Sequence, residues 1–130
     1  MVKGCEAPEV ILVRAIEPIE VYGYAAMGVS VEQVAAVEEQ EEVEAEKYLK
    51  GIATQLGKSG INARPDIIHG KAAAALIDFV TKNEIDLVII ATHGRSGVSR
   101  WVWGSVADRL LRGVCSPVLM VRAPGCVPEV

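Results

Sequence analysis

The sequence predicts an α/β fold in which helices cover both faces of a parallel, twisted β-sheet. Four apolar runs of strand length alternate with three segments of helical character, in the order β-α-β-α-β-α-β. Strands separated by helices pair in parallel, and a parallel sheet is covered on both faces. No internal repeat, linker or low-complexity segment interrupts this series.

The composition is that of one domain covering residues 1–130, with residues 123–130 expected to form a flexible tail. Although 51% of the residues are hydrophobic, no apolar run approaches the roughly 18 residues that a membrane span needs. The pattern of a secretory signal is missing, and the three cysteines form no CxxC pair. We therefore expect a soluble, cytoplasmic protein without a membrane partner.

Charge is distributed unevenly along the chain. Residues 1–60 carry 11 acidic and 5 basic side chains, whereas residues 61–130 carry 6 acidic and 8 basic ones. The strongly acidic first half argues against a general nucleic-acid-binding surface, and the mildly basic second half is suited to anions.

The first strand is predicted at Glu9–Ala15, a β-branched apolar run that Pro18 prevents from continuing. Residues 18–29 contain glycines and a proline without a hydrophobic period, so we expect a loop there. Ser30 has the position of a helix N-cap, and Gln33 completes the pattern of a capping box.

The helix that follows is predicted over Val31–Leu56, with Gly57 as its C-cap. Its glutamates precede Lys47 and Lys50, an order that suits the helix dipole and i,i+4 pairing. This run of glutamates has two interpretations. It is a metal-binding or protein-binding site, or it is a solvated helix face, which we favour. The run consists of Glu38, Glu39, Glu41, Glu42, Glu44 and Glu46.

The second strand is predicted at Ile61–Ile68, where Pro65 cannot donate a ladder hydrogen bond and therefore favours an edge position. An alanine-rich helix is predicted over Lys71–Asn83.

The last part of the chain contains a third strand, a glycine-containing loop, a short helix and a fourth strand. The strands are predicted at Asp86–Ile90 and Pro117–Val121, the loop over Ala91–Gly104, and the helix from Ser105. A loop between the carboxyl end of a strand and the amino end of a helix is where α/β proteins hold phosphates.

This loop has the chemistry that an anion site needs, although each feature has a structural explanation too. Glycines let the backbone approach an anion closely, the helix from Ser105 offers N–H groups, and arginines supply positive charge. Against this, Ser105 and Asp108 form a capping-box pattern by themselves, and His93 can cap the strand end. Trp101 and Trp103 favour packing over base stacking. The glycines and arginines are Gly94, Gly97, Gly104, Arg95 and Arg100.

The segments ATHGRSG, WGSVA and SPVLMVR resemble the C-terminal signature of the universal stress protein family. That signature is a glycine, two residues, a glycine, nine residues, and then a glycine followed by serine or threonine. The corresponding positions here are Ala91, Gly94, Gly104 and Ser105, so three of the four match. EVILVRAIEP and the HG after Ile68 also resemble the family's second and third strands, and the resemblance covers residues 9–122.

The resemblance implies an adenine-nucleotide-binding-like fold with strand order 3-2-1-4-5 and a homodimer formed through the last strand. Here that strand is Pro117–Arg122, and we expect it to pair antiparallel with its copy, because an exposed apolar edge needs cover. The implied ligand is ATP, with Mg²⁺ accompanying it. The resemblance assigns the adenine and ribose to the backbone near Ala15, Ile90 and Ala91, and the phosphates to Gly94, Gly104, Ser105 and Val106.

Two departures from the family pattern bear on this site. Ala91 replaces a glycine, which costs roughly 1–2 kcal/mol if the backbone needs a positive φ there. The family's first strand and helix, with an aspartate that contacts the nucleotide, have no counterpart here. In the order 3-2-1-4-5 the missing first strand would lie between the second and the fourth. This gap is closed by pairing of these two strands with each other, by a partner chain, or by the rest of a longer chain.

The sequence thus predicts a universal-stress-type module that binds an adenine nucleotide through residues 91–106. The alternative is a homodimeric interaction protein of the same fold that binds no nucleotide. An enzyme is poorly supported beyond slow ATP hydrolysis, because the chain has no GxxxxGK[ST] loop. We assign no catalytic residue and no metal ligand.

Overall fold

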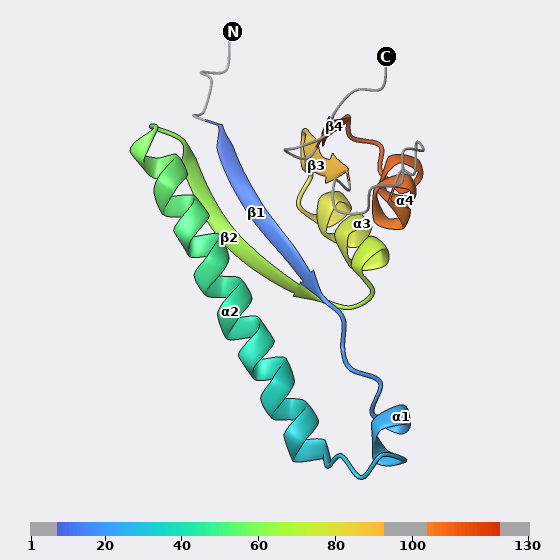
Figure 1. Cartoon of the computed structure of the whole chain (residues 1–130). Helices are drawn as coiled ribbons and strands as arrows, with labels where there is room; N and C mark the ends of the chain where they lie inside the picture. The colour runs from blue at the N-terminus through green and yellow to red at the C-terminus, as the bar shows by residue number, and fades with distance from the viewer. Residues whose placement is uncertain (1–7, 93–103, 123–130) are drawn as a thin grey trace, which may run out of the picture. The chain divides into compact units, whose positions relative to one another are not determined.

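The computed structural model describes residues 8–92 and 104–122. The chain divides into two compact units, Met1–Lys71 and Ala72–Val130. Each unit is a parallel βαβ arrangement with one additional helix, and each is described by itself below (Figure 1). The single-domain organisation expected from the sequence stays a prediction.

The first unit consists of two long parallel strands and the helix that connects them. Strand β1 (Glu9–Ile16) pairs with β2 (Asn62–His69) in a register that places Glu9 opposite Asn62 and Ile16 opposite His69. Helix α2 (Val31–Lys58) is the crossover and lies along the strand pair (Figure 1). The predicted strand at Ile61–Ile68 is therefore present, displaced by one residue, and Pro65 lies opposite Leu12.

Apolar side chains of α2 build the core of this unit. Val34, Ala45 and Leu49 are buried on the helix, and Ile16 is buried at the end of β1. The spacing of the three helical residues places them on one face, as a 3.6-residue period requires. Burying side chains of this size stabilises a fold by about 1.5–3 kcal/mol each for valine or leucine.

The predicted start of α2 is confirmed and its predicted end is wrong. The Ser30 hydroxyl accepts a hydrogen bond from the Gln33 N–H at 3.2 Å, and the Gln33 side-chain oxygen accepts one from the Ser30 N–H at 2.9 Å. At the other end, the helix continues through Gly57 to a C-cap at Ser59. Gly60 follows with φ +78°, so it is the glycine that supplies the left-handed conformation after the helix.

The loop predicted over residues 18–29 contains a short helix, α1 (Val21–Ala25). Glycine and two tyrosines give this segment little helical propensity of its own. Long-range and turn hydrogen bonds hold it instead. The Ile19 N–H donates to the Glu38 carboxylate at 2.8 Å, and the Val29 N–H donates to the Tyr24 carbonyl at 3.1 Å.

The glutamate run of α2 is a structural element rather than only a solvated face. Beside the contact of Glu38 with Ile19, Glu41 lies 3.7 Å from the Arg14 guanidinium of β1. Glu42 lies 3.6 Å from the His69 imidazole at the end of β2. These half-exposed pairs link the helix to both strands but are worth little, about 0–1 kcal/mol each, so the buried apolar side chains contribute most to holding the helix in place.

The second unit contains α3 (Ala72–Lys82), β3 (Val88–Thr92), α4 (Ser105–Gly113) and β4 (Val118–Arg122). Strands β3 and β4 are parallel, with Val88 opposite Val118 and Thr92 opposite Arg122. Every element of this unit was predicted from the sequence, with boundaries that differ by one or two residues.

Helices α3 and α4 pack closely against each other. Leu110, Ala107, Val80 and Ala73 are buried. Gly113 ends α4 so near to α3 that a Cβ atom added there would collide with the side chain of Ile77. A larger residue at this position would displace the Ile77 side chain, so the glycine favours the close approach of the two helices, a role that its sequence context does not reveal.

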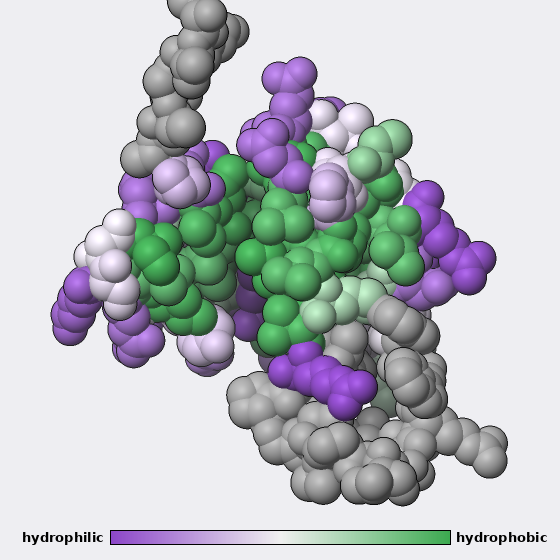
Figure 2. All heavy atoms as spheres, turned by 90° about the horizontal axis from the view of Figure 1, so that it is seen from above, coloured by the Kyte–Doolittle hydropathy of each residue, from purple (hydrophilic) through white to green (hydrophobic). Residues whose placement is uncertain are grey.

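The β3–β4 pair has one half-buried face and one exposed face. Val88, Ile90, Val118 and Met120 are half-buried, whereas their neighbours along each strand, Ile89, Leu119 and Val121, are exposed. The space-filling view shows hydrophobic surface open on the face drawn, with hydrophilic side chains around it (Figure 2).

The predicted α/β class with parallel strands is confirmed. Among the described residues the strands form two separate two-stranded sheets, β1–β2 and β3–β4. The order 3-2-1-4-5 with its first strand missing stays a prediction. No described helix combines the length and the apolarity that crossing a membrane would require.

Candidate functional site

The carboxyl end of β3 contains two of the predicted nucleotide-binding residues. Ile90 is half-buried and pairs with Met120, and the next residue, Ala91, is exposed and pairs with Val121. Among the described non-glycine residues only Glu84 has a positive φ. Ala91 therefore has ordinary strand geometry, and the alanine carries no left-handed backbone cost.

The amino end of α4 contains three more of the predicted residues. Gly104 is the N-cap, with φ −52° and ψ 145°, and Ser105 and Val106 are the first two helical residues. Since glycine has no side chain, the N-cap contributes no side-chain hydrogen bond. The first N–H group that closes an intrahelical bond is that of Asp108, which donates to the Gly104 carbonyl at 3.0 Å.

This geometry overturns the capping-box explanation of Ser105 and Asp108. Ser105 lies inside the helix rather than at the N-cap, so its hydroxyl is one position too late for that motif. Asp108 instead accepts a hydrogen bond from Arg112 at 3.2 Å, one turn further along α4. The N–H groups of the first turn consequently point out of the helix end without a cap from Gly104.

The order of elements places this helix end beside the carboxyl ends of the strands. Helix α4 follows β3 and leads to β4, which starts level with the beginning of β3 because Val88 pairs with Val118. The helix must therefore return the chain from the carboxyl end of β3 to its amino end. In parallel α/β sheets this edge is where anionic ligands meet helix N-termini.

Ala15, the remaining described residue of the predicted set, belongs to the first unit. It is half-buried, pairs with Ile68, and is the penultimate residue of β1. It therefore has the expected position at the carboxyl end of its strand. Gly94, together with His93, Arg95, Gly97, Arg100, Trp101 and Trp103, lies outside the described residues.

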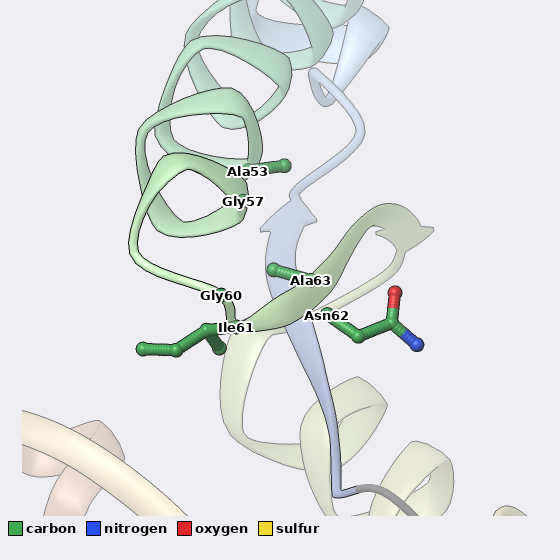
Figure 3. A pocket seen from close by; sticks show the side chains of 6 residues that line it. All are labelled: Ala53, Gly57, Gly60, Ile61, Asn62 and Ala63. Atoms are coloured by element: carbon green, nitrogen blue, oxygen red, sulfur yellow. The ribbon is translucent and has the colours of Figure 1, made fainter.

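A shallow hollow of about 360 Å³ lies at the opposite end of the first unit (Figure 3). Its walls are Ala53 and Gly57 of α2, Gly60 and Ile61 of the following turn, and Asn62 and Ala63 of β2. Ile61 and Asn62 point in opposite directions, and no charged side chain lines the hollow. Because it adjoins the amino end of β2, it lies at the other end of the strand pair from Ala15.

Among the described residues no group of three or more His, Cys, Asp or Glu side chains could hold a metal ion. The functional feature that the sequence reasoning missed is the uncapped start of α4. Its signal was present in Gly104, which precedes Ser105 and offers no capping side chain.

Comparisons with known proteins agree with this geometry. The model of the universal stress protein family matches residues 6–122. Universal stress protein A homolog 2 of Coxiella burnetii is 35% identical over 118 residues, which are 88% of this chain and 74% of that protein. Universal stress protein MJ0531 of Methanocaldococcus jannaschii is 30% identical over 81 residues, and this match spans 62% of this chain but only 48% of the relative's length.

Solved structures show the same fold. Hypothetical protein MJ0577 of Methanocaldococcus jannaschii superposes with a TM-score of 0.74 at 21% identity, covering 95% of this chain and 82% of that one. Hypothetical protein PH0823 superposes with a TM-score of 0.67 at 24% identity, covering 94% of this chain and 78% of that one. At these identities the likeness concerns the fold.

Proposed function

Because this chain belongs to the universal stress protein family, we propose that it binds ATP, accompanied by Mg²⁺, through residues 91–106. The observation that carries the proposal is the start of α4. Gly104 ends the family spacing that begins at Gly94, and it leaves the first turn of the helix without a side-chain cap.

The physical case rests on what the first turn of α4 can offer to a phosphate. Ser105, Val106 and Ala107 carry N–H groups that have no intrahelical acceptor, and the helix dipole adds a partial positive charge at the same place. An anion there gains charge-assisted hydrogen bonds without displacing any capping side chain.

The adenine and ribose would lie against the backbone near Ile90 and Ala91. The exposed Ala91 leaves room for a ligand, and its strand geometry removes the steric objection that the missing glycine raised. Mg²⁺ would be held by the phosphates, since the described side chains offer no cluster for it. A cytoplasmic location is part of this proposal.

Isothermal titration of the folded chain with ATP, in the presence and absence of Mg²⁺, tests the proposal. We expect saturable binding of one nucleotide per chain, and weaker binding of adenosine, which lacks the phosphates. If millimolar ATP gives no heat and no rise in melting temperature, nucleotide binding is excluded. A turnover assay on the same samples would report whether slow hydrolysis accompanies binding.

A second candidate function is a homodimeric interaction protein that binds no nucleotide. The observation that favours it is β4, an apolar strand in which Leu119 is exposed and Val118 and Met120 are half-buried. One edge of this strand pairs with β3, and the other edge faces away from β3. Antiparallel pairing of Pro117–Arg122 with a second copy would cover it.

Sedimentation combined with analysis of co-purified nucleotide separates the two candidates. A stable dimer that contains no nucleotide and does not respond to added ATP supports the second function. Retained ATP, or a dimer that forms only with ATP, rejects it. A charge placed at Met120 should yield monomers or aggregates, and an unchanged dimer would show that β4 is not the interface.

A further inference from the structure

The segment around α1 displays an apolar surface that the fold does not use. Four side chains within ten residues are exposed, and we refer to them as the α1 patch: Tyr22, Tyr24, Met27 and Val31, with exposed fractions of 97%, 46%, 79% and 64%. None of the residues of α1 is buried. Large aromatic and methionine side chains are the types that anchor protein interfaces when they are found at a surface.

Hydrogen bonds hold the backbone of this segment on both sides of α1. The Ile19 N–H donates to the Glu38 carboxylate before α1, and the Met27 and Val29 N–H groups both donate to the Tyr24 carbonyl after it. Ser30 then caps α2, while half-buried Val29 and buried Val34 have the spacing of a hydrophobic staple. A surface that is ordered before binding loses less conformational entropy when a partner docks.

The half-buried residues of the segment show which side faces the fold. Ile19, Val21 and Val29 are half-buried, and they lie in sequence before and after the exposed Tyr22, Tyr24 and Met27. The segment lies at the amino end of α2 (Figure 1). One side of it is therefore fastened to α2, and the other side is presented outward.

The charge around the α1 patch has a single sign. Between Ala15 and Glu46 the sequence contains nine glutamates and no lysine or arginine. Several of these glutamates are engaged within the fold, but Glu20, which precedes α1, and Glu32, in the first turn of α2, are exposed and make no ion pair within the described part of the chain. A cation that approaches the patch meets uncompensated carboxylates on both sides of it in sequence.

We propose that the α1 patch is a docking surface for a basic amphipathic helix of a partner protein. The apolar face of such a helix would cover Tyr22, Met27 and Val31, and its lysines or arginines would pair with Glu20 and Glu32. An apolar anchor ringed by charge of one sign selects a partner of the opposite sign and speeds its association.

Two other occupants suit the surface less well. A membrane with anionic lipids would attract basic residues beside an apolar patch, and here the flanking charges are all acidic. A second copy of this segment would bring glutamates against glutamates, because the same residues would flank the patch on both chains.

Fluorescence anisotropy with two labelled helical peptides tests the proposal on the full chain. Both peptides carry leucines on one face, and the other face carries lysines in one peptide and glutamates in the other. We expect the lysine peptide to bind with an affinity that falls as salt is added, and the glutamate peptide not to bind. Equal binding of both peptides, or of neither, would overturn the proposal.

Matched variants locate the binding. The double substitution Tyr22→Ser with Met27→Ser should weaken binding of the lysine peptide at least about tenfold, whereas Tyr48→Ser, at a tyrosine of α2 that is 63% exposed, should leave it unchanged. Glu20→Gln with Glu32→Gln should give a smaller loss and a flatter salt dependence. If the two double variants bind like the unaltered chain, the patch is not the docking surface.

Two further outcomes would identify a different occupant. Sedimentation of the chain with vesicles containing anionic lipid should give no binding that depends on Tyr22 and Met27, and such binding would indicate a membrane surface instead. If the Tyr22→Ser, Met27→Ser variant changes the oligomeric state of the chain, a second copy occupies the patch and the proposal fails.

Discussion

Helices α2 and α4 begin in opposite ways. Ser30 closes the start of α2 with a reciprocal pair of hydrogen bonds to Gln33, so the side chains of the helix itself satisfy its first N–H groups. Gly104 starts α4 and brings no side chain to the same task. A helix start that needs only to be stable is capped by its own residues, whereas a start that lacks a cap is available to an anion.

The difference carries a cost in stability. A side-chain N-cap is worth about 0.5–2 kcal/mol relative to alanine, although glycine recovers most of this. The α4 start therefore gives up only a few tenths of a kcal/mol, and Gly104 itself places no side chain over the N–H groups of the first turn. Substitutions in the second unit test whether its packing holds the amino end of α4 in place.

The largest expected effect is on the packing that holds α4. Leu110 is 2% exposed, and Leu110→Ala should lower the free energy of unfolding by about 2–5 kcal/mol, because it removes buried methyl groups and leaves a cavity. Urea denaturation measures the change. Leu111→Ala, at the neighbouring leucine that is 49% exposed, is the control and should change stability by less than about 1 kcal/mol. Equal losses in the two variants would mean that α4 is not packed as described.

A smaller loss is expected at the end of α4. Gly113→Ala places a methyl group against Ile77 and should cost about 1–3 kcal/mol. Ile77→Val, which removes the nearest methyl of α3, should recover part of that loss in the double variant. Gly51→Ala serves as control, since nothing lies within 4 Å of its Cβ position and alanine is the better helix former there, by about 0.5–1 kcal/mol.

The third prediction closes the open helix end directly. Gly104→Asp supplies the missing N-cap and should leave stability unchanged or raise it by a few tenths of a kcal/mol. The same carboxylate would occupy the anion position and repel phosphate, so ATP affinity should fall at least tenfold, which is about 1.4 kcal/mol. Thermal unfolding and titration calorimetry measure the two effects. Unchanged affinity in a stable Gly104→Asp chain would remove α4 from the nucleotide site.

The smallest effect is expected at the closed helix start. Ser30→Ala removes the hydroxyl that accepts from the Gln33 N–H and should cost about 1 kcal/mol in urea denaturation, with no change in ATP binding. Ser59→Ala, at the other end of α2, should cost less because the hydrogen bonds of that cap are made by its backbone N–H. If Ser30→Ala lowers ATP affinity, the start of α2 contributes to nucleotide binding as well as to stability, and the contrast between the two helix starts is wrong.

Most of the secondary structure could be predicted because the local signals are strong. Three of the four strands are apolar runs, and the capping-box residues Ser30 and Gln33 mark the start of α2. Pro65 predicted a strand at the edge of its sheet, and this stays a prediction, because each described sheet has only two strands. In each case the deciding physics acts between residues close in sequence.

The features that escaped prediction depend on residues far apart in sequence. Helix α1 forms where Glu38 receives the Ile19 N–H, nineteen residues away, and the segment itself contains no helical period. The pairs of Glu41 with Arg14 and of Glu42 with His69 depend on how α2 lies over the two strands. At the candidate site, Ser105 is displaced by one position from the N-cap, and a capping-box pattern cannot show that shift.

Pro65 has a further consequence for how this protein behaves at high concentration. A strand with one unpaired side is a template on which other chains can add strands, the first step toward fibrils. On such a strand the nitrogen of a proline faces solvent, so an incoming chain finds no donor near the middle of β2. Arg64 and Asp66, joined by an ion pair of 3.4 Å, place charges on both sides of that position. Pro65 and these two charges thus oppose the addition of a further strand to β2.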